Sequence, residues 1–123
     1  MAKSTKILWL TKPEEGNYPA AQSYLELVYP EVKAHELVKK LRRAKISEFK
    51  AKDIFRASQL SLLGVSNSHI KKDKKKIRKK ESLSPILLVR DSENSKVIIA
   101  DGYHRLCAIY QLHEDIWIRC KII

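Results

Sequence analysis

The hydrophobic pattern of the N-terminal half predicts one strand followed by helices. Residues 6–11 form a short apolar run that ends before Pro13, which favours a buried first strand. Apolar side chains then recur at helical spacing in residues 20–29 and 31–43, and Pro30 separates the two predicted helices. The positions expected to face the core are Ala21, Tyr24, Leu25, Val28, Val32, Leu37, Val38 and Leu41.

The middle of the chain predicts two more helices joined by a connector. Residues 49–57 have the pattern of a short helix, and residues 61–65 that of a buried connector in which Gly64 permits a sharp turn. A lysine-rich helix is expected next, with one narrow apolar stripe formed by Ile70 and Ile77. Its candidate N-caps are Ser66, Asn67 and Ser68.

The last third of the chain has the hydrophobic pattern of strands as well as of a helix. Two β-branched runs, residues 85–90 and 96–100, flank a short polar loop and predict a hairpin. Asp101 and Gly102 stop the second run, and a helical pattern follows before an alternating C-terminal strand. We therefore expect a single α+β domain over residues 1–123, with helices packed on a small mixed sheet and a β-β-α-β unit in residues 84–123.

Positive charge is concentrated in one segment. The formal net charge is +11, and residues 71–80 carry eight of the 25 basic residues against one of the 14 acidic ones. Such a field attracts polyanions, either nucleic acid or triphosphates, although a solvated helix face that maintains solubility has the same pattern. The candidate nucleic-acid contacts are Lys71, Lys72, Lys74, Lys75, Lys76, Arg78, Lys79 and Lys80.

Composition narrows the class of protein. A chain of 123 residues suits one domain. Cys107 and Cys120 lie in apolar stretches without paired spacing, which favours a reducing compartment over a disulfide or metal framework. No apolar run approaches the roughly 18 residues of a membrane span, and the N-terminus lacks the pattern of a signal peptide. We expect a cytoplasmic protein with no membrane partner.

The sequence from Asp101 to Arg105 carries the candidate chemistry. A strand that turns through Gly102 into a helix directs free amides and the positive end of the helix dipole at one point, where anions bind. Arg105 could donate bidentate hydrogen bonds to phosphate oxygens there, or it could form only a salt bridge within the protein. Asp101 could cap the helix, hold His104, orient a metal or take a proton. Ser68 and His69 at the start of the basic helix offer a second anion position, or simple capping.

Residues 84–90 and 96–110 resemble the ParB/sulfiredoxin-like superfamily at the level of motifs, over about the last third of the chain. In that family a proline-led strand, its hairpin partner and a glycine before His-Arg or Arg-Arg at a helix start build a pocket for nucleotide phosphates. The resemblance implies a ParB/sulfiredoxin-like fold here. It also implies that residues of the turn contact the phosphates, namely Gly102, Tyr103, His104 and Arg105. Arg90, at the end of the first strand of the hairpin, would be their neighbour.

The sequence departs from each branch of that family. Sulfiredoxins have a cysteine where this chain has Tyr103, which argues against sulfinic-acid repair. ParB clamps have Glu-Arg-Arg after the glycine and need a further helix-turn-helix domain, which argues against chromosome partitioning. The ParB-like free-serine kinases have Asp-Gly-His-His-Arg, which is similar to the string from Asp101 to Arg105. Residues 19–65 match no branch and are expected to form a helical insertion that supplies specificity.

Three functional hypotheses follow. The first is a nucleotide-binding domain, either a phosphotransferase or an NTPase that uses ATP or ADP with Mg²⁺, in which Asp101 and His104 are the catalytic candidates. The second is a nucleic-acid-binding protein or ParB-like nuclease acting through the basic helix of residues 71–80. The third is a regulatory protein whose basic helix binds an acidic partner. Oligomeric state and choice of base have no signature in the sequence.

Overall fold

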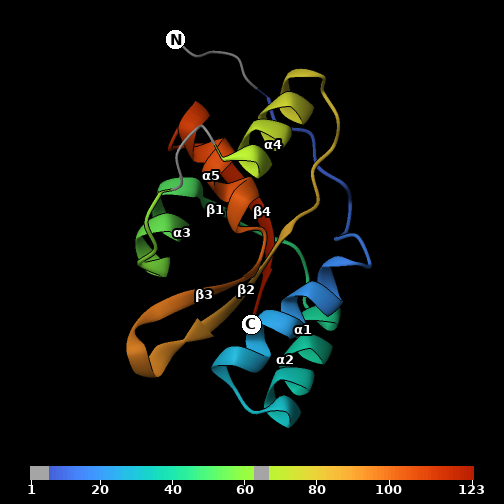
Figure 1. Ribbon diagram of the computed structural model, residues 1–123, viewed down its shortest axis with the longest axis vertical. Coiled ribbons are helices and arrows are strands. Elements are labelled where there is room, and N and C mark those ends of the chain that lie inside the picture. The colour runs from blue at the N-terminus through green and yellow to red at the C-terminus, as the bar shows by residue number, and fades with distance from the viewer. Residues whose placement is uncertain (1–5, 63–66) are drawn as a thin grey trace.

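Helices flank a small sheet in this protein (Figure 1). The computed structural model describes residues 6–62 and 67–123. In chain order the elements of that part are α1 (Asn17–Val28), α2 (Glu31–Arg43), β1 (Ser47–Lys50), α3 (Ala51–Ser58), α4 (Ser68–Arg78), β2 (Ile86–Asp91), the 3-10 helix η1 (Ser92–Asn94), β3 (Lys96–Asp101), α5 (Tyr103–Leu112) and β4 (Trp117–Ile122). The α+β class predicted from the sequence is therefore confirmed.

The sheet is mixed, with the strand order β1-β4-β2-β3. β2 and β3 pair antiparallel as the predicted hairpin, and β1 pairs antiparallel with β4. β4 also runs parallel to β2, so the C-terminal strand lies in the interior of the sheet. β2, β3, α5 and β4 form the expected β-β-α-β unit, with η1 in the loop of the hairpin.

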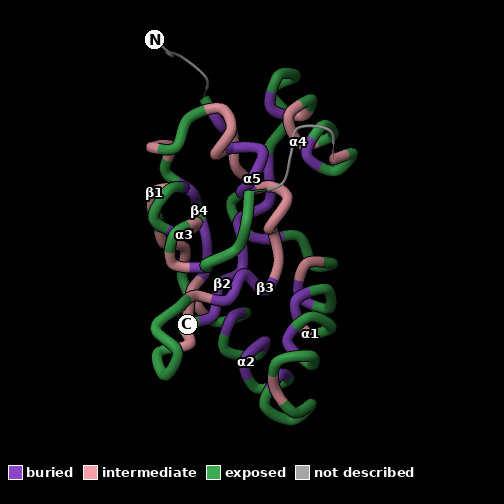
Figure 2. The backbone as a smooth tube through the Cα atoms, turned by 60° about the vertical axis from the view of Figure 1, so that its left-hand side comes forward, coloured by how far each residue is buried: buried purple, intermediate pink, exposed green. Residues whose placement is uncertain are grey.

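Two hydrophobic cores lie on opposite faces of the sheet, and β2 contributes to both. Leu87 and Val89 pack with the apolar faces of α1 and α2, whereas Ile86 and Leu88 pack with α3 and α5. Because successive side chains of a strand point to opposite faces, four consecutive apolar residues can all be buried. Figure 2 shows this continuous burial along β2.

α4 packs on α5 rather than directly on the sheet (Figure 1). Ile70 and Ile77 are buried, as the narrow apolar stripe predicted, and most of the lysines on the remaining faces are exposed. Asn67 is the N-cap, since its side chain accepts hydrogen bonds from the amides of His69 and Ile70. Of the other two candidate caps, Ser68 is the first residue of the helix and Ser66 lies outside the described residues.

Two predicted elements of the N-terminal half were wrong. Residues 6–11 form no strand but a single parallel bridge between Trp9 and Leu83, because only a short stretch runs beside the residues that precede β2. Residues 49–57 do not form one helix, because the edge of β4 pairs with residues 47–50 and makes them the strand β1. α3 begins only at Ala51.

The buried faces of α1 and α2 differ in part from the prediction. α1 begins at Asn17, so its buried stripe is Tyr18, Ala21 and Leu25, while the side chains of Tyr24 and Val28 are exposed. In α2, Val32 is 73% exposed, because it lies off the buried stripe that Ala34, Leu37, Val38 and Leu41 form at helical spacing. The bounds of α2 itself, Glu31–Arg43, agree with the prediction.

Two further expectations about burial were wrong. The alternation of the C-terminal strand predicts that Lys121 lies on its exposed face with Trp117 and Arg119. Lys121 is instead buried, because its ammonium group donates to the backbone carbonyl of Arg42 and lies over the ring of Tyr18. In the connector, Ser61 and Leu62 are exposed, and residues 63–65 lie outside the described residues. Among the described residues no helix has the length and apolar character needed to cross a membrane.

Candidate anion-binding site

The turn between β3 and α5 depends on Gly102. Its φ of 110° lies in the left-handed region, and a Cβ at this position would meet Ile86 Cγ2 at 2.6 Å. Gly102 is also the N-cap of α5 and provides no side-chain cap. Since the first amides of a helix have no intrahelical acceptor, the uncapped start of α5 leaves donors and a positive dipole end for another group.

A pocket of about 190 Å³ opens between this turn and one flank of α4. The α4 residues that line it share one helix face, because their spacing returns to the same side of the helix. All lining side chains except that of the glycine can ionise: His69, Lys72, Asp73, Lys76, Asp101, Gly102, His104 and Arg105. The fold therefore brings the phosphate-turn candidate and part of the basic segment to one place.

Arg105 is held from two sides. Its Nη2 lies 3.1 Å from Asp101 Oδ2 and 3.4 Å from Asn17 Oδ1, and Asn17 Oδ1 also accepts from the hydroxyl of Ser84. The side chains of Arg105 and Asp101 are only 17% and 18% exposed. Arg105 Nε is buried and has no hydrogen-bond partner among the described residues, so the protein satisfies this guanidinium only in part.

Burial shifts the pKa of both carboxyls in the pocket. It raises the pKa of Asp101, and the attraction of Arg105 offsets only part of that effect. Burial likewise raises the pKa of Asp73, against the attraction of Arg105, Lys76 and both histidines of the pocket. The three permanent cations of the lining, Lys72, Lys76 and Arg105, outnumber its two carboxyls, so the pocket keeps a positive balance that favours an anion even when both carboxyls are ionised.

Both histidines of the predicted site reach the pocket. The rings of His69 and His104 lie 4.7 Å apart between centroids, so α4 and α5 meet at these two side chains. Tyr103 turns away from the pocket, because its hydroxyl donates to the backbone carbonyl of Ser61 and its ring faces Phe55. Ser68 is exposed at the start of α4 and does not line the pocket.

The structure does not bring Arg90 to this site. Arg90 pairs with Val97, whereas Asp101 pairs with Leu87, three residues earlier on β2. That separation corresponds to about 10 Å along the strand. Arg90 instead lines a shallow depression at the other end of the sheet.

The basic segment divides into pocket and surface residues. Lys72 and Lys76 line the pocket, and Lys74 donates to the side chain of Gln111 at 3.0 Å. The other candidate nucleic-acid contacts are exposed and lie outside the pocket: Lys71, Lys75, Arg78, Lys79 and Lys80. One helix thus presents two cationic surfaces, of which only one faces the α5 turn.

Sequence reasoning missed three residues of the site. Asp73 had a signal, because it is the single acidic residue in the basic segment. Asn17 and Ser84 had none, since 67 residues separate them along the chain and only the fold joins them beside Arg105.

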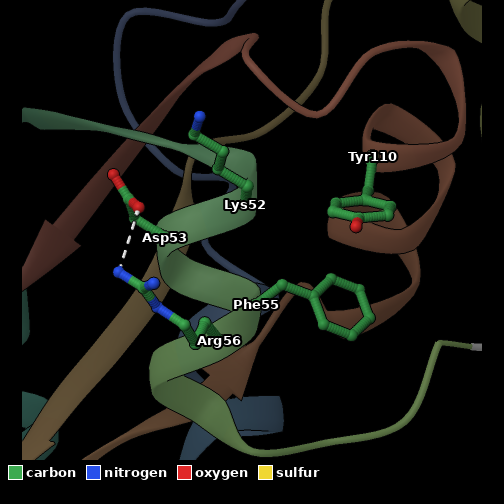
Figure 3. A pocket seen from close by; sticks show the side chains of 5 residues that line it. All are labelled: Lys52, Asp53, Phe55, Arg56 and Tyr110. Atoms are coloured by element: carbon green, nitrogen blue, oxygen red, sulfur yellow. Dashed lines mark ion pairs between the residues drawn. The ribbon is translucent and has the colours of Figure 1, made fainter.

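A wider depression of about 520 Å³ lies between α3 and α5 and contains none of the predicted site residues (Figure 3). The rings of Phe55 and Tyr110 lie next to each other in it, tilted by 49°, with centroids 4.9 Å apart. Its cations have acidic neighbours, since Lys52 pairs with Asp115 at 2.9 Å and Arg56 lies 3.8 Å from Asp53. Two cations therefore meet two carboxylates here, whereas the pocket at α5 has three permanent cations against two carboxyls and is the better candidate for an anion.

Comparison of the chain with protein-family models, curated proteins and solved structures finds no match in any of the three. The candidate site therefore rests on its own geometry and charge.

Proposed function

We propose that this protein is a nucleotide-binding domain of the ParB/sulfiredoxin-like kind, which holds the phosphates of its ligand at the start of α5. The observation that carries the proposal is the pocket in which the uncapped Gly102 turn faces Lys72 and Lys76 of α4. Helix amides, a guanidinium and two ammonium groups converge there. These are the donors that phosphate-binding sites use.

The arrangement of cations around this pocket favours binding of a phosphate group over binding of a small monovalent anion. Asp101 and Asn17 hold the guanidinium of Arg105 in place before a ligand arrives, so little side-chain entropy remains to be lost on binding. The two lysines approach from a different helix and can reach other oxygens of the same group. Several cations around one pocket match a group with several charged oxygens.

As an enzyme, a domain with this site would catalyse phosphoryl transfer from the bound nucleotide. Asp101 would accept the proton of the attacking hydroxyl, and its raised pKa suits a group that must take up a proton. His104 would donate to the transferred group from the first turn of α5. The described residues include no group of three or more His, Cys, Asp or Glu side chains placed to hold a metal ion. Any Mg²⁺ would therefore be held largely by the phosphates of the nucleotide.

Two matched double variants of α4 test the phosphate site. Lys72→Gln with Lys76→Gln removes both pocket lysines, whereas Lys71→Gln with Lys75→Gln removes the same charge from positions outside the pocket. Isothermal titration with ATP, ADP and CTP in the presence of Mg²⁺ should show affinity that falls by about tenfold or more only in the pocket variant. Equal effects of the two variants, or no binding to the wild type, would refute the proposal.

Nucleic-acid binding is the second candidate, and one observation favours it. Five cations of the basic segment are exposed outside the pocket, on and just after α4, where they could track a phosphate backbone. This function predicts that the two double variants weaken binding of a labelled DNA or RNA duplex equally. It also predicts that affinity falls steeply with salt, which a fluorescence-anisotropy titration at several salt concentrations measures.

A further inference from the structure

A second pocket, of about 440 Å³, adjoins the anion-binding pocket. The two share Asp101, Gly102 and His104, so a single ligand that contacts the start of α5 can enter both. Together their volumes fall within the range of about 300–1,000 Å³ that is typical of small-molecule sites. The start of α5 thus separates two compartments of one larger site.

The chemistry of the second pocket differs from that of the first. Apart from the shared residues its lining is apolar or aromatic, from α1, the segment after α3, the end of β3 and the start of α5: Ala20, Tyr24, Leu60, Ile99, Ala100 and Tyr103. Ile99 and Ala100 of β3 are buried, while Tyr24 and Leu60 are each 42% exposed. The pocket therefore offers packing surface to a flat apolar group.

Few side chains in this pocket have a hydrogen-bonding group left to recognise such a ligand group. The hydroxyl of Tyr103 is engaged by the carbonyl of Ser61, and the carboxyl of Asp101 is engaged by Arg105. The other polar side chains of the lining are His104, which is shared with the anion pocket, and Tyr24, which carries one hydroxyl. A group bound here would be recognised by its shape and its faces more than by its edges.

We propose that the ligand is a nucleoside phosphate whose base packs between Tyr24 and Leu60, with weak preference among bases. This inference rests on the proposed function, because it requires the phosphates to lie at the start of α5. A nucleobase supplies the flat apolar faces that the pocket accommodates, and the shared residues join it to the phosphates over a short distance. Tyr24 provides the aromatic face, since stacking on an aromatic side chain tolerates every base.

The test measures the contribution of the base to affinity separately from that of the phosphates. Isothermal titration compares tripolyphosphate with ATP, GTP and CTP on the wild type, Tyr24→Ala, Leu60→Ala and Leu27→Ala. Leu27 is the matched control, because it lies on the same helix as Tyr24, is 84% exposed and does not line the pocket. The wild type should bind all three nucleotides within a few-fold of each other, and on the order of tenfold more tightly than tripolyphosphate.

Tyr24→Ala and Leu60→Ala should each reduce this nucleotide advantage and leave tripolyphosphate affinity unchanged, while Leu27→Ala changes neither. Equal affinity of the wild type for ATP and tripolyphosphate would overturn the inference, as would a Tyr24→Ala variant that keeps the full advantage. In both cases the binding of tripolyphosphate would leave the phosphate site standing. Absence of binding to tripolyphosphate and to every nucleotide would overturn the phosphate site as well.

Discussion

Replacing Gly102 with alanine perturbs the fold and the candidate site at one point. The backbone there has a φ of 110°, a conformation that residues with a Cβ rarely adopt. The new methyl group would lie 2.6 Å from Ile86 Cγ2 and 3.0 Å from Arg105 Nη2. The arginine can move because it is a long side chain, but Ile86 is fully buried in the sheet and has little room to do so.

Two costs combine in this variant. The left-handed backbone costs a residue with a Cβ about 1–2 kcal/mol. Insertion of a methyl group into a packed core costs about 1–3 kcal/mol more. We therefore expect Gly102→Ala to lower the free energy of unfolding by about 2–5 kcal/mol, a large fraction of the roughly 5–15 kcal/mol of a typical domain.

Urea unfolding followed by tryptophan fluorescence and by circular dichroism measures this loss. Gly16→Ala is the control, because nothing lies within 4 Å of a Cβ at that position and its φ of −63° suits any residue. The control should change stability by no more than about 0.5 kcal/mol. A loss below about 1 kcal/mol in Gly102→Ala, similar to that of the control, would refute the steric argument.

Three further predictions concern stability, each measured by urea unfolding. Asn67→Ala should cost about 1 kcal/mol by removing the cap of α4, while Ser68→Ala costs less than half as much; equal losses would contradict the capping role. Lys121→Ala should cost about 2 kcal/mol, because it removes a buried charged donor from a backbone carbonyl at the end of α2. Arg119→Ala, on the exposed face of the same strand, should cost less than about 1 kcal/mol. Asp73→Asn should flatten the pH dependence of stability. Burial raises the pKa of Asp73 in the folded state, so with rising pH the unfolded chain loses this proton first. The wild type therefore loses stability as the pH rises from about 4 through the raised pKa, and the variant does not. Parallel pH profiles of wild type and variant would contradict that assignment.

The candidate site could be predicted only in part. The turn at Asp101 and Gly102 was visible in the sequence, because a strand that stops at Asp-Gly before a helix is a local pattern. Its connection to Lys72 and Lys76 was not visible, since α4 reaches α5 only after the chain has folded. The resemblance made Arg90 a neighbour of this turn, but the register of β2 and β3 places Arg90 opposite Val97 and not beside Asp101.

The sequence by itself determined the elements whose signals are local. α2, α4, α5 and the hairpin followed from helical spacing, a capping asparagine and β-branched runs, all of which act within a few neighbouring residues. The tertiary structure decided everything that depends on a distant partner. Residues 47–50 form a strand because they pair antiparallel with β4. Lys121 is buried because its ammonium group can donate to a backbone carbonyl of α2. Such pairings depend on free energy gained across the fold, which no short stretch of sequence contains.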